Sequence, residues 1–224
     1  MLRLAVIALL LTSSACVDER VDLQRGPLGP ATYEVTFSVT GDPAVRTEPV
    51  TAVLDVEDRP DGAVLRLDIG DDVPVITEFV RTPEGRLFLD TVQGVSPSSA
   101  GEADLASIVD QLDPPLAGRP VRMRESWSAR RRIDTDVLTA DLRTRMEVVR
   151  FLRVAAVDAA ELRGRVTGTL ETTGATGTFS GRVEGTTRVD WALSPGRVAA
   201  SRTDLRWTIP DIGTVRLQTS VRPV

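Results

Sequence analysis

Most of the chain after residue 31 alternates apolar and polar residues with a period of two, which is typical of half-buried β-strands. Tyr33, Val35 and Phe37 begin the first such segment, and a longer one runs from Leu138 to Val148. Short segments rich in Pro, Gly and Asp separate the strands, as expected of turns. The pattern predicts about eleven antiparallel strands, each paired with its neighbours in the sequence.

One segment follows a helical period instead. Leu105, Ile108, Val109 and Leu112 have the i, i+3, i+4 and i+7 spacing of an amphipathic helix. Residues 99–102 have capping-box spacing, and the prolines that follow Asp113 end the helix because proline cannot continue its hydrogen bonds. We expect this helix, near residues 102–113, to pack on the sheet.

Residues 164–185 are rich in glycine and threonine, and glycine within strands marks bends or close backbone approach. An inner face on which glycine alternates with Phe179 and Val183 would leave space for an apolar ligand. A strongly curved or edge part of the sheet with a thin core is the other interpretation. The candidate lining of a ligand cavity is therefore Leu105, Ile108, Val109, Leu112, Phe179 and Val183.

These patterns predict a mainly β fold. We expect residues 32–224 to form one domain, a single curved antiparallel sheet of about eleven strands with one amphipathic helix packed on it. The sheet is expected to be a half-barrel or an open barrel.

The N-terminus has the organisation of a signal peptide. Arg3 precedes an apolar run over residues 4–11, small residues follow, and Cys16 is the only cysteine of the chain. The run is shorter than the about 20 apolar residues that span a bilayer, so a cleaved signal is favoured over a membrane-spanning helix. An ordinary secretory signal cleaved after Ala15, with an incidental free thiol, is the alternative.

Ser14-Ala15-Cys16 resembles the lipobox of bacterial lipoproteins, although Ser13 stands where that family usually has Leu. The resemblance implies that residues 1–15 are a lipoprotein signal peptide and that Cys16 becomes acylated, for example with palmitate. It implies a protein anchored to a membrane of the bacterial cell envelope, and Val17 favours the outer membrane if the source is Gram-negative. Residues 16–31, with Gly26-Pro27 and Gly29-Pro30, are expected to form a flexible tether.

Composition excludes most catalytic chemistry. The chain has no His, no Lys and no Asn, so histidine-dependent nucleophiles, histidine-ligated metals, Schiff bases and the phosphate-loop lysine are all absent. Its formal net charge of −5 argues against nucleic acid as a partner. The acidic residues near turns match no calcium-loop spacing, and Asp134 and Asp136 on one strand face lack a second feature of a carboxylate enzyme. We therefore predict no catalytic residue, no metal and no cofactor.

Six arginines surround Trp127 in a mostly cationic segment. They are Arg119, Arg122, Arg124, Arg130, Arg131 and Arg132. On a strand, Arg130 and Arg132 face one way and Arg131 faces the other, so they cannot form one flat patch. Contact with anionic lipid headgroups or an acidic polymer is one interpretation, and a solvated edge strand, which we favour, is the other.

The predicted architecture is similar to that of bacterial half-barrel envelope lipoproteins, the group that includes lipoprotein-localisation factors and mycobacterial lipid-binding lipoproteins. Uncharacterised secreted lipoproteins also share a segment like Pro115, Gly118, Pro120 and Val121 ahead of Trp127. Two functions follow from these resemblances. The first is a non-enzymatic structural or interaction module of the envelope with a protein partner, and the second is a carrier that holds an acyl chain or similar ligand between sheet and helix.

Overall fold

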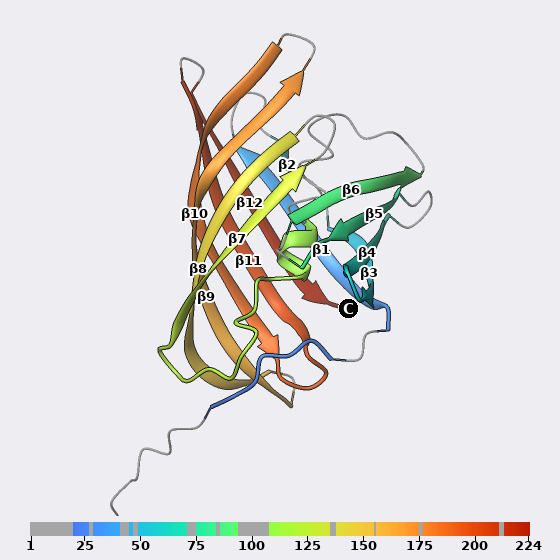
Figure 1. The fold of residues 1–224 in the computed structure, drawn as a ribbon, viewed down its shortest axis with the longest axis vertical. Coiled ribbons are helices and arrows are strands. Elements are labelled where there is room, and N and C mark those ends of the chain that lie inside the picture. The colour runs from blue at the N-terminus through green and yellow to red at the C-terminus, as the bar shows by residue number, and fades with distance from the viewer. Residues whose placement is uncertain are drawn as a thin grey trace, which may run out of the picture.

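Strands dominate the computed structural model, which describes residues 20–26, 29–40, 45–46, 49–70, 75–83, 86–93, 108–134, 138–154, 156–174, 177–210 and 213–224 (Figure 1). The strands in chain order are β1 (Ala31–Thr40), β2 (Val45–Arg46), β3 (Val50–Arg59), β4 (Gly62–Ile69), β5 (Val75–Arg81), β6 (Arg86–Gln93), β7 (Ser126–Asp134), β8 (Leu138–Val154), β9 (Val157–Gly174), β10 (Gly177–Ala192), β11 (Arg197–Ile209) and β12 (Gly213–Pro223). They form one sheet.

The alternation of residues decides which side of each strand is buried. In β8, Leu142, Met146 and Val148 are buried, whereas Arg143 and Arg145 between them are exposed. The buried side chains of all the long strands meet in one hydrophobic core inside the sheet. The mainly β class is therefore confirmed.

The sheet closes on itself, which corrects the expected half-barrel or open barrel. β1 pairs antiparallel with β12, from Tyr33 opposite Pro223 to Thr40 opposite Arg216. The result is a closed barrel of eleven strands, to which β2 adds a two-residue pairing on β1. Closure removes the two long edges that an open sheet would expose, and no local pattern in the sequence signals it.

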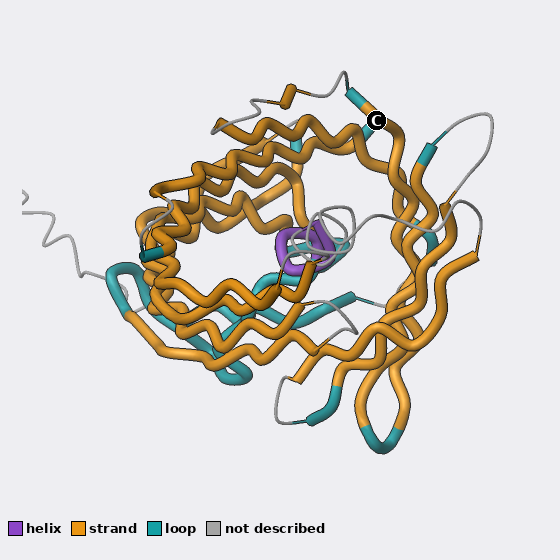
Figure 2. Tube along the Cα trace, turned by 90° about the horizontal axis from the view of Figure 1, so that it is seen from above, coloured by secondary structure: helices purple, strands orange, loops and turns teal. Residues whose placement is uncertain are grey.

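One pair of neighbours departs from the expected antiparallel order. β6 and β7 are parallel, with Arg86, Leu87 and Phe88 opposite Arg132, Ile133 and Asp134. Parallel neighbours need a crossover connection. The described part of that connection, residues 108–125, includes a helical stretch at residues 108–112 that lies within the ring of strands (Figure 2). The helix therefore occupies the barrel interior and does not cover the sheet from outside.

Two inward-facing glycines allow the tight curvature of the glycine-rich strands. A Cβ on Gly168 of β9 would overlap the carbonyl oxygen of Asp141, and one on Gly185 of β10 would overlap that of Asp204. Both glycines thus permit close backbone approach between neighbouring strands. β9 and β10 are each paired on both sides, so this segment is a curved part of the sheet and not an edge.

Candidate functional site

Residues 108–121, called here the plug segment, enter the barrel interior with their helical stretch, whereas residues 118–120 are exposed. Ile108, Val109 and Leu112 are between 0% and 5% exposed and belong to the main core. Farther along, Val121 forms an antiparallel bridge with Val21, with N–O distances of 2.8 and 2.9 Å. The plug segment is therefore held by apolar packing at its start and by backbone hydrogen bonds at its end.

Residues 20–26 belong to the segment expected to act as a tether, and in the structure they contact the barrel. Leu23 is 3% exposed and belongs to the same core. Gly26 donates a backbone hydrogen bond to the carbonyl of Gly196, at 3.1 Å. This arm thus fixes the end of the plug segment from one side.

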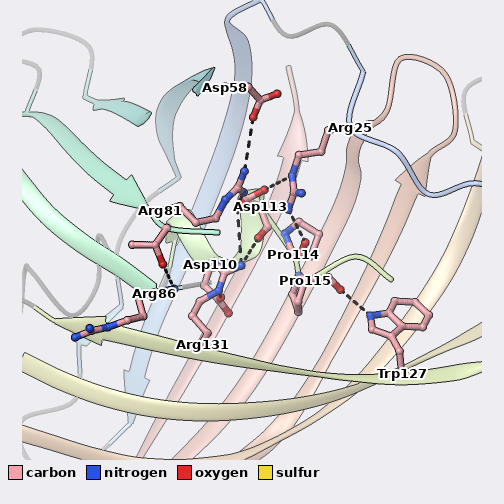
Figure 3. Close-up of polar contacts among 11 residues, drawn as sticks. Arg25, Asp58, Arg81, Arg86, Asp110, Asp113, Pro114, Pro115, Trp127 and Arg131 are labelled. Carbon is pink, nitrogen blue, oxygen red and sulfur yellow. Dashed lines mark hydrogen bonds and ion pairs between the residues drawn. The ribbon is translucent and has the colours of Figure 1, made fainter. Parts of the chain in front are cut away.

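A cluster of charged residues around the buried Asp113 lies where the helical stretch ends (Figure 3). Asp113, 3% exposed, accepts a hydrogen bond from Arg25 Nε at 2.6 Å and another from Arg81 Nη1. Arg131 donates from Nη2 to the backbone carbonyl of Asp113 at 2.8 Å, and its Nε lies 2.9 Å from Oδ1 of Asp110. These five residues are called the Asp113 cluster, and its arginines come from the arm, β5 and β7.

The two carboxylates of the cluster are shifted in opposite directions. Burial alone would raise the pKa of Asp113, but Arg25, Arg131 and Arg81 together hold that pKa below its ordinary value. Burial raises the pKa of Asp110, because Arg131 offsets it only in part and the charge of Asp113 adds to it. Burial also lowers the pKa of Arg25, against the opposing attraction of Asp113. Asp113 is therefore the anion around which the cluster is built.

The two prolines after Asp113 leave backbone carbonyls that side chains satisfy. Arg25 donates to the carbonyl of Pro114 at 3.3 Å, and Trp127 Nε1 donates to that of Pro115 at 3.0 Å. Trp127, singled out in the sequence for its arginine neighbours, thus anchors the plug segment.

A small cavity of about 80 Å³ remains between the plug segment and the opposite barrel wall. Asp110, Gln111, Pro114 and Pro115 line it from the plug side. The wall contributes mainly apolar side chains and three threonines: Ile133, Leu138, Ala140, Leu142, Thr144, Val166, Leu170, Val183, Thr187, Val189, Thr203, Leu205 and Leu217.

The predicted cavity residues are only partly brought together. Val183 lines the cavity, whereas Ile108, Val109 and Leu112 are buried in the core without lining it. Phe179 is half-buried and lies outside the lining. Leu105 and Cys16 fall outside the described residues, so ligand binding and lipidation stay predictions.

Buried and exposed arginines alternate in the arginine-rich segment, as the strand pattern predicts. Arg131 is 6% exposed inside the barrel, whereas Arg130 and Arg132 are exposed. Sequence reasoning missed Asp113, Arg25 and Arg81. One signal was available: an inward-facing arginine needs a buried acid, and buried arginines are rare unless paired.

The described residues contain no group of three or more acidic or cysteine side chains placed to hold a metal ion. Among the same residues, no helix has the length and apolar character to cross a membrane.

Comparison with known proteins gives one structural likeness. The sequence matches no protein-family model and no curated protein. Among solved structures, the hypothetical lipoprotein YmcC from Escherichia coli K12 is similar, with 12% identity over 92% of each chain and a TM-score of 0.33. A TM-score this low carries no argument about fold or function.

Proposed function

We propose that this protein is a lipid-anchored component of the bacterial cell envelope, attached through Cys16, and that its barrel is a non-enzymatic interaction module. The N-terminal pattern that ends at Cys16 supports the anchor. The filled interior of the barrel supports the module.

The small volume of the remaining cavity is the main support for an interaction module. An apolar cavity of about 150 Å³ is large enough to bind benzene. The cavity beside the plug segment has about 80 Å³, so it is too small for an acyl chain in this arrangement. A barrel whose interior is packed offers its outer surface and its ends to partners.

A carrier of an apolar ligand remains the second candidate. It is favoured by the mainly apolar wall of the cavity, which includes Val183, and by the position of the plug segment along one side. A ligand that displaced the plug segment would gain that wall as a binding surface. It would also have to separate Asp113 from its three arginines, which opposes such a movement.

Metabolic labelling tests the anchor. The full chain, expressed in a bacterial host with an alkyne analogue of palmitate, is expected to incorporate the label and to fractionate with membranes. The Cys16→Ser variant is expected to lose both properties. Equal labelling of the two chains, or labelling of neither, would overturn the proposed anchor.

Native mass spectrometry separates the module from the carrier. The Cys16→Ser chain that starts at residue 16, purified without detergent, is expected to show its bare mass. A reproducible added mass of lipid size, lost on organic extraction, would favour the carrier.

A further inference from the structure

The barrel wall has an incomplete seam between β6 and β7. β6 pairs with β7 only at Arg132, Ile133 and Asp134. Within the described sheet, residues 126–131 of β7 therefore pair with β8 alone. A cleft of about 520 Å³, called here the side cleft, opens beside this free edge. Its lining residues are Arg25, Arg59, Pro60, Gly62, Arg81, Thr82, Pro83, Pro115, Leu116, Ala129, Arg130 and Arg131.

Arginine is the charged residue that lines the side cleft. The lining includes five arginines from the arm, the ends of β3 and β5, and β7, and no described Asp or Glu side chain belongs to it. Four of these arginines are already paired with acids outside the lining: Arg59 with Glu57, Arg81 with Asp58 and Asp113, Arg25 with Asp113, and Arg131 with Asp110. The fifth, Arg130, therefore supplies the unpaired charge among the described residues of the side cleft.

Two of the five arginines retain unused hydrogen-bonding capacity. Arg130 is exposed and forms no ion pair with any described residue. Arg131 is 6% exposed, and its buried Nη1 atom has no hydrogen-bond partner among the described residues. An unsatisfied buried donor costs free energy, about 1–3 kcal/mol for a typical group. An anion in the side cleft would give Arg130 the partner that it lacks among the described residues.

We propose that the side cleft binds a phosphate group, carried either by the headgroup of an anionic lipid or by a free phosphate ester. Guanidinium groups pair with phosphate through two parallel hydrogen bonds, and arginines from separate elements suit a group with several terminal oxygens better than a two-oxygen carboxylate. The apolar side chains beside them, such as Leu116 and Ala129, accommodate the organic part of such a molecule. This site does not depend on the anchor or on the module proposed above.

Calorimetric titration at low ionic strength tests the site. The full chain, purified in a neutral detergent, is titrated with inorganic phosphate, glycerol 3-phosphate and dihexanoyl phosphatidylglycerol. Saturable one-to-one binding that weakens as salt is added is the expected result. Binding of all three probes would identify the phosphate itself as the ligand group, and binding of the lipid alone would identify a lipid headgroup.

Three variants localise the binding. Arg130→Gln and Arg59→Gln are each expected to weaken it about tenfold, the loss of one charge-assisted hydrogen bond. Both arginines are exposed, so the barrel does not need them to fold. Arg202→Gln on β11 is the matched control. The substitution removes the same charge from an exposed side chain, and Arg202 lies outside the side cleft. Absence of binding by every probe, or an equal loss in the Arg202 variant, would overturn the proposal.

Discussion

Replacement of Asp113 by Asn is expected to destabilise the barrel by about 3–5 kcal/mol, the cost of removing one partner from a buried ion pair. We expect the loss of stability for Asp113→Asn to lie near the upper end of that range. The side chain of Asp113 is 3% exposed, and those of Arg131, Arg81 and Arg25 are 7%, 14% and 26% exposed. An amide still accepts hydrogen bonds, but it leaves three guanidiniums near each other without the anion between them.

Urea titration followed by tryptophan fluorescence measures this loss as a change in the free energy of unfolding. Glu57→Gln is the matched control: Glu57 is 69% exposed and pairs with Arg59, so its loss is expected to cost at most about 1 kcal/mol. A loss for Asp113→Asn no larger than that of the control would refute the role of the cluster in holding the plug segment.

Acidification gives a second measure of the same contribution. Because the pKa of Asp113 is lowered in the folded state, its stabilisation is fully present above the ordinary aspartate pKa of about 3.9. It is lost as the pH falls through the folded-state pKa. The free-energy difference between the wild type and Asp113→Asn is therefore expected to shrink below about pH 4. A difference that stays constant down to pH 2 would contradict the lowered pKa.

Three further perturbations test other parts of the structure. Asp110→Asn is expected to behave oppositely to the Asp113 variant, because the pKa of Asp110 is raised in the folded state. Relative to the variant, the wild type should lose stability in urea titrations as the pH rises above about 4. Leu23→Ala is expected to cost about 2–5 kcal/mol and to make the arm more susceptible to limited proteolysis, since Leu23 is 3% exposed; unchanged digestion would show that the arm is not held by this side chain. Gly185→Ala is expected to lower the melting temperature, because its Cβ would overlap the Asp204 carbonyl, whereas Gly29→Ala, with open space around it, should not.

The elements that the sequence predicts well are those whose signal is local. The alternation from Leu138 to Val148 falls within β8, and that from Tyr33 to Val39 falls within β1. The predicted helix also ends where the helix of the structure ends, since residues 108–112 are helical and Asp113 is not. In each case neighbouring residues decide the result, through side-chain direction or the effect of proline.

The features that the sequence did not predict depend on residues far apart in the chain. Tyr33 pairs with Pro223, and Asp113 meets Arg25 and Arg81 across 88 and 32 residues. Strand alternation put Arg131 on the opposite face from Arg130 and Arg132, but it showed neither that this face lies inside the barrel nor which acid pairs with Arg131. An amphipathic helix that buries its apolar side packs equally well outside a sheet or inside a barrel, so its period does not distinguish the two positions.

The pairing of β1 with β12 also determines when the barrel can be completed during synthesis. β1 finds its partner β12 only after β12 has been made, so these hydrogen bonds cannot form on a partly synthesised chain. Pairings between such distant segments slow folding because the chain must first bring its ends together. Until β12 arrives, the open side of β1 is an unpaired edge able to pair with another chain. The stage before β12 pairs is therefore the stage of folding at which this edge is exposed to aggregation.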